Sequence, residues 1–100
     1  MIVRGTTPTI RYTFSNVDIA DIATCYLTIK QGTTVIEKTL QDATAGDGYL
    51  DWVLSQAETL SLDENQNAEV QIRYKMTSGM VYASTISTGL PYKILKQGEI

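Results

Sequence analysis

The sequence contains no histidine among its 100 residues. Histidine is the side chain that most often acts as a base near neutral pH, and it commonly activates a serine or cysteine nucleophile. A serine nucleophile in this chain would need a lysine or a terminal amine as its base. No glycine-rich loop of the kind that binds nucleotide phosphates is present either. We therefore expect no enzymatic activity and no catalytic residues.

Cysteine is nearly absent as well, since Cys25 is the only one. An intramolecular disulfide is therefore excluded, which fits a reducing compartment or a fold that needs no covalent cross-link. Cys25 alternates with Leu27 and Ile29, and this phase favours a small buried apolar side chain. The alternative is a reactive thiol, but no histidine is available to act as its base.

A cluster of positive charge is also missing. The eight Lys and Arg residues are scattered singly, and the net charge is −3 with a pI near 4.7. Nucleic-acid-binding proteins usually carry a basic patch, so we expect no nucleic-acid partner.

No apolar run approaches the ~20 residues that cross a bilayer, and none at the start resembles a signal peptide. We expect no membrane association, synthesis in the cytoplasm, and any action outside the cell to follow lysis or packaging into a particle.

The acidic residues are densest in the segment QDATAGDGYLD, which contains Asp42, Asp47 and Asp51. A calcium loop of the EF-hand type needs oxygen ligands at alternate positions and a closing glutamate, and this segment has neither. Asp and Gly are also the residues that favour turns. We therefore interpret the segment as a loop and expect no metal or other cofactor.

Several short segments show the alternation of apolar and polar residues that is typical of half-buried strands. Strands are predicted over residues 7–14, 24–30, 33–40, 49–54, 68–77 and 80–88, with 90–95 as a candidate seventh. The spacing of about ten residues favours an antiparallel β-sandwich. The length predicts a single domain over residues 1–100, with a function on its surface rather than in a deep active site.

Two local features refine this prediction. Ser55 is followed three residues later by Glu58, a capping box that predicts one short helical turn near residues 56–60. Trp52 is the largest apolar side chain, and it shares the inward phase of its strand, so it is expected at the centre of the core.

Six tyrosines are the richest functional signal in the composition. Tyr26 is out of phase with Cys25 and Leu27, and Tyr82 alternates with Val81, so both are expected to face outwards. Exposed tyrosines are typical of surfaces that bind a protein or a sugar. Tyrosines also occupy the rims of β-sandwiches without any binding role, and this alternative stays open.

Four segments together resemble a known group of proteins: RGTTPT (4–9), LSQAETLSL (54–62), VQIRYKMTSGMVYAS (70–84) and ILKQGEI (94–100). Their order and spacing are similar to those of small proteins encoded by prophages of Firmicutes, in the tail and baseplate gene region. The pattern also resembles the N-terminal immunoglobulin-like domain of siphophage upper baseplate proteins. The resemblance covers nearly the whole chain.

The resemblance implies an immunoglobulin-like sandwich of six to seven strands that acts as an accessory or connecting component of a virion. The implied partners are other phage structural proteins or further copies of the chain, and the implied location is the host cytoplasm and then the particle. We expect Tyr26 and Tyr82 to form the contact together with Thr9 and Arg11 of the first strand. A small carbohydrate-binding module is the alternative function.

Overall fold

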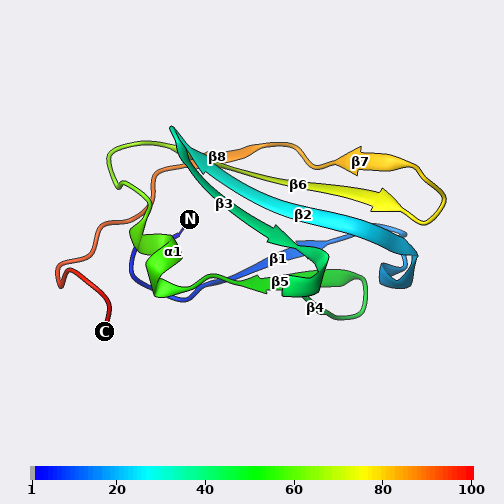
Figure 1. Ribbon diagram of the computed structural model, residues 1–100, viewed down its shortest axis with the longest axis horizontal. Coiled ribbons are helices and arrows are strands. Elements are labelled where there is room, and N and C mark those ends of the chain that lie inside the picture. The colour runs from blue at the N-terminus through cyan, green and yellow to red at the C-terminus, as the bar shows by residue number, and fades with distance from the viewer. Residues whose placement is uncertain (1) are drawn as a thin grey trace.

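Two antiparallel sheets form the molecule, whose computed structural model describes residues 2–100. The prediction of an all-β antiparallel sandwich is confirmed (Figure 1). The larger sheet has the order β3-β2-β6-β7, and β8 also pairs with β6; the smaller sheet has the order β1-β5-β4. The strands of the larger sheet are β2 (Ile22–Gln31), β3 (Thr34–Thr39), β6 (Ala68–Met76), β7 (Val81–Ala83) and β8 (Ser87–Gly89). The strands of the smaller sheet are β1 (Thr9–Thr13), β4 (Thr44–Ala45) and β5 (Tyr49–Val53).

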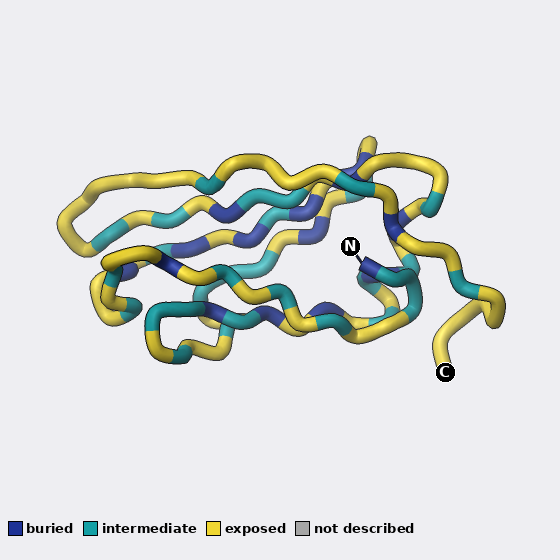
Figure 2. The backbone as a smooth tube through the Cα atoms, turned by 180° about the vertical axis from the view of Figure 1, so that it is seen from behind, coloured by how far each residue is buried: buried dark blue, intermediate teal, exposed yellow. Residues whose placement is uncertain are grey.

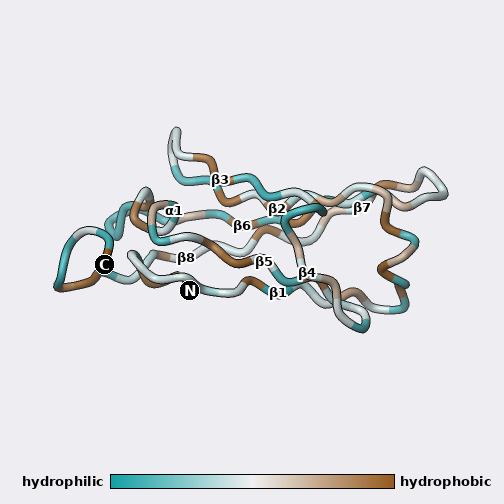
Figure 3. The backbone as a smooth tube through the Cα atoms, turned by 60° about the horizontal axis from the view of Figure 1, so that its bottom comes forward, coloured by the Kyte–Doolittle hydropathy of each residue, from teal (hydrophilic) through white to brown (hydrophobic). Residues whose placement is uncertain are grey.

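The core lies between the sheets and follows the alternation along β2. Cys25, Leu27 and Ile29 are each fully buried, and the tube in Figure 2 shows buried segments alternating with exposed ones along the strands. The smaller sheet covers them with Trp52 of β5, which is also fully buried. Hydrophobic and hydrophilic positions both occur along β5 (Figure 3). The indole N–H of Trp52 donates to the carbonyl of Thr39 at 2.9 Å, so this core side chain also joins β5 to β3.

The short helix α1 (Gln56–Leu60) forms where the capping box predicted it. The Glu58 amide donates to Ser55 Oγ at 3.1 Å, and the Ser55 amide donates to Glu58 Oε1 at 2.8 Å. Two further single turns of 3-10 helix, η1 (Ile19–Asp21) and η2 (Leu40–Asp42), occur in the links between strands. The first described residues and the C-terminus both lie towards the end of the sandwich that carries α1 (Figure 1).

Eight strands form within residues 2–100, where six to seven were expected. The extra strand β4 has only two residues and lies in the segment interpreted as a loop, so it is too short to show an alternation. The segment predicted as a strand over 80–88 divides into β7 and β8, because the Ser84 hydroxyl accepts the Ile72 amide at 2.9 Å in place of a backbone carbonyl. Residues 90–95 contribute only an isolated bridge between Tyr92 and Val3.

Gln31 is a buried polar residue that the sequence analysis missed. Its side chain is 5% exposed at the end of β2. Its amide nitrogen donates to the carbonyls of Asp63 and Gln66, each at 2.7 Å, and its carbonyl oxygen accepts the Asp63 amide at 2.7 Å. Three hydrogen bonds from one side chain therefore fix the loop that leads into β6.

Replacing Gln31 with Ala should destabilise the fold by about 2 kcal/mol, because backbone groups near the core lose their partners. Urea unfolding measures the change. The matched control is Gln97→Ala, whose exposed side chain bonds only the nearby Ile94 carbonyl and should change stability by less than about 0.5 kcal/mol. Equal midpoints for the two variants would show that the three hydrogen bonds contribute nothing.

Candidate functional site

The larger sheet is packed against the smaller sheet on one side only. We call its other side the outer face. Residues that are directly opposite in an antiparallel pair point to the same side, so the register defines which side chains lie there. They are Thr24, Tyr26, Thr28 and Lys30 of β2, Val35, Glu37 and Thr39 of β3, Glu69, Gln71, Arg73 and Lys75 of β6, Val81 and Ala83 of β7, and Thr88 of β8.

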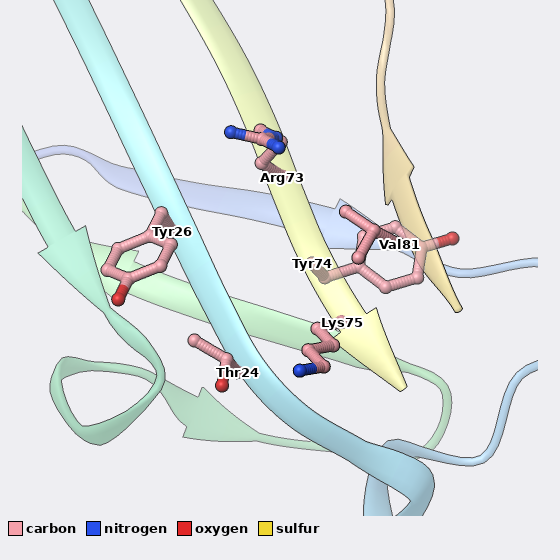
Figure 4. A pocket seen from close by; sticks show the side chains of 6 residues that line it. All are labelled: Thr24, Tyr26, Arg73, Tyr74, Lys75 and Val81. Carbon is pink, nitrogen blue, oxygen red and sulfur yellow. The ribbon is translucent and has the colours of Figure 1, made fainter. Parts of the chain in front are cut away.

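An open depression of about 210 Å³ lies on the outer face (Figure 4). Tyr26 is directly opposite Arg73 across the β2–β6 pair, and Thr24 is opposite Lys75. Val81 of β7 closes the far side. Tyr26 is 40% exposed and Val81 is 52% exposed, so the depression presents an apolar surface with a cationic side chain on each of two successive rows. This arrangement can bind by burial of apolar area combined with charge.

Tyr82 does not share the outer face with Tyr26, although both were expected to face outwards. It is opposite Tyr74 in the β6–β7 register, and the two ring centroids are 5.5 Å apart. The Tyr74 ring in turn packs edge-to-face on Phe14, a buried core residue, at 4.9 Å. Tyr82 therefore points to the core side of the sheet, and it is 46% exposed because it stands at the sheet margin.

Arg11 and Thr9 lie on a third surface, the exposed side of the smaller sheet. Arg11 forms a two-pronged ion pair with Asp51, at 2.8 and 2.9 Å, and its guanidinium stacks 3.8 Å from the centre of the Tyr49 ring. The hydrogen bonds from Arg11 lower the pKa of the Asp51 carboxyl below its usual range. Thr9 is exposed at the start of β1. The four residues predicted to share one contact thus fall on three separate surfaces.

The other acidic and thiol groups have local structural roles. Asp42 accepts the Thr39 amide at 2.8 Å, and this hydrogen bond lowers the pKa of its carboxyl. Cys25 is fully buried, and burial raises the pKa of its thiol to about 11. Within residues 2–100, no group of three or more His, Cys, Asp or Glu side chains is placed to hold a metal ion.

Arg73, Lys75 and Val81 were not among the predicted site residues. The alternation along residues 70–75 does place Arg73 and Lys75 on the polar side of their strand. What the sequence could not supply was the cross-strand register that sets them beside Tyr26 and Thr24.

No family model, curated protein or solved structure matches this chain. Across residues 2–100, no helix combines the length and the apolar character that crossing a membrane requires.

The Arg11–Asp51 pair generates a prediction about pH. Because the folded-state pKa of Asp51 is lowered, its contribution to stability is present above the ordinary Asp pKa of about 4 and is lost as pH falls through the folded-state value. Replacing Arg11 with Gln should raise the pKa of Asp51 towards about 4, which NMR titration of the side-chain carboxyl measures. The pKa of Asp42, which makes no contact with Arg11, should not move and serves as the internal control. An unchanged Asp51 pKa would contradict the assigned cause.

Proposed function

We propose that this chain is a non-enzymatic structural protein of a bacteriophage particle, a tail or baseplate component that acts through protein–protein contacts. The observation that carries the proposal is the outer face, where exposed Tyr26 and Val81 adjoin Arg73 and Lys75. Within the described residues, neither Arg73 nor Lys75 forms an ion pair inside the chain. The resemblance of four segments to phage tail and baseplate-region proteins supplies the kind of particle.

The composition and shape of this surface favour a protein partner. Tyrosine and arginine are enriched where protein interfaces bury their central residues. Pockets for small molecules usually enclose about 300–1,000 Å³, whereas the depression beside Tyr26 holds about 210 Å³ and is open. An open depression of this size on a sheet face is better matched by another protein surface than by a small substrate.

The alternative function, a carbohydrate-binding module, would use exposed aromatic rings as a platform for sugars. Tyr26 and Tyr82 point to opposite sides of the larger sheet, so they cannot form one platform. Tyr26 would have to serve alone, with Thr24 and Arg73 as its polar neighbours. This geometry favours the protein-contact proposal over the sugar-binding one.

Mass spectrometry of purified particles from an induced lysate of the source bacterium tests the virion assignment. We expect peptides of this chain in a fixed ratio to a tail protein, because a structural component occupies a set number of positions. The chain's presence in the lysate but not in intact particles would overturn the assignment. An assembly factor or a host-directed binding protein would then be favoured.

The same particles test the surface. Replacing Tyr26 with Ser should lower incorporation about tenfold or more, since truncating a central interface residue commonly costs about 2 kcal/mol. The melting temperature should stay within a few degrees, because Tyr26 is an exposed residue. Val53→Ser is the matched control: Val53 is 59% exposed on the smaller sheet, and its loss should leave incorporation unchanged. Equal incorporation of the two variants would exclude the outer face as the contact.

A further inference from the structure

The strand β7 is an open edge of the larger sheet. The Met76 amide donates to the Met80 carbonyl and the Ser84 amide donates to the Ile72 carbonyl, each at 2.8 Å. In an antiparallel pair, residues whose backbone groups point to the neighbouring strand alternate with residues whose groups point away. Met80, Tyr82 and Ser84 therefore face β6, and the N–H and C=O groups of Val81 and Ala83 point out from the sheet. These are the groups with which another strand can pair.

This edge lacks the features that usually prevent such pairing. Residues 80–90, MVYASTISTGL, contain no charged residue and no proline. Met80, Val81, Tyr82 and Ile86 are each about half exposed, at 57%, 52%, 46% and 54%. Natural proteins protect exposed edges with charges, prolines or coverage by other elements, and only the shortness of β7 serves that purpose here.

The two longer edge strands, β1 and β3, are protected. Strand β1 begins after Pro8 and carries Arg11, and β3 carries Glu37 and Lys38. Because β1 and β3 carry protective residues and β7 does not, β7 is the edge strand best suited to pair with another strand.

We propose that β7 pairs antiparallel with β7 of a second copy of this chain, about a two-fold axis through Tyr82. In this register Val81 is opposite the partner's Ala83, and Tyr82 is opposite the partner's Tyr82. It is the register that joins outward-pointing groups to outward-pointing groups across the whole of β7. The contact is made by the backbone edge of β7, whose Val81 and Ala83 side chains belong to the outer face, and it goes beyond the function proposed above.

Charge and aromatic packing favour a second copy as the occupant. Two-fold pairing places each strand against itself, so any charge near the axis would meet its own like, and β7 carries none. Tyr82 also ends a series of contacting rings, Tyr12–Phe14–Tyr74–Tyr82, with centroid distances of 4.8, 4.9 and 5.5 Å. The partner's Tyr82 continues this series across the axis, because opposite residues outside the hydrogen-bonded pairs bring their side chains closest. A charged partner strand would find no opposite charge on β7.

The experiment is disulfide trapping of the purified chain with Tyr82→Cys. The proposed register brings the two Cβ atoms to within about 5 Å, close to the separation that a disulfide needs. After mild oxidation we expect at least about tenfold more covalent dimer from Tyr82→Cys than from Val53→Cys, because only pre-associated thiols have a high effective concentration. The native Cys25 contributes little background, since it is fully buried. Equal yields from the two variants would overturn the proposal.

A second measurement keeps Tyr82 in place, in case Tyr82→Cys fails to fold. Sedimentation equilibrium of the unmodified chain should show a mean mass that rises with concentration. Ala83→Pro should abolish the rise, because it removes an outward N–H from the pairing edge and leaves the lining of the depression beside Tyr26 unchanged. The pairing would be contradicted if the unmodified chain stayed monomeric at every concentration. It would also be contradicted if the variant associated as strongly as the unmodified chain. Because both experiments use the isolated chain, their failure leaves the particle incorporation test unaffected.

Discussion

The burial of Trp52 between the two sheets is the interaction on which the rest of the structure depends. Its ring is fully buried, and its N–H donates to the carbonyl of Thr39, so one side chain both fills the core and joins the smaller sheet to the end of β3. An unpaired indole N–H in this position would carry a desolvation penalty. The position of β5 beneath β2 therefore satisfies packing and hydrogen bonding at the same time.

This arrangement determines where function can reside. The smaller sheet covers one side of the larger sheet, and the described chain leaves the outer face and the β7 edge exposed (Figures 1 and 2). Most of the interior is filled by apolar side chains. Cys25 is enclosed among them, and burial raises the pKa of its thiol. The surface offers tyrosine and valine for apolar burial, Arg73 and Lys75 for charge, and the outward backbone groups of β7 for strand addition. We infer that the chain works by assembling with other proteins.

Much of the fold could be predicted from local sequence because alternation is a local property. It identified the inward phase of Cys25, Leu27 and Ile29, and the capping box identified α1. Gln31 continues the same odd-numbered phase, so its burial was signalled, but it lies between the predicted strands 24–30 and 33–40, where a turn was expected. Strand β7 has three residues, which is too short to show an alternation of buried and exposed side chains by itself. Only its pairing with β6 reveals that Tyr82 points to the core side.

The candidate site was less predictable than the fold because it depends on register between strands. The outward direction of Tyr26 followed from its phase in β2. Its neighbours Arg73 and Val81 come from strands about 47 and 55 residues further along the chain, and no local pattern connects them. Arg11 and Thr9 were grouped with the tyrosines on exposure alone, and exposure does not say which of three surfaces a residue shares.

Hydroxyl-radical footprinting of the chain, in purified particles and in isolation, reports which side chains become covered on assembly. If the larger sheet makes the contact, Tyr26 and Met80 lose most of their reactivity in the particle. Tyr92 and Leu95, which are 57% and 94% exposed away from the outer face and β7, should remain as reactive as in the isolated chain. Protection of Tyr92 and Leu95, with Tyr26 and Met80 still reactive, would contradict assembly through the larger sheet.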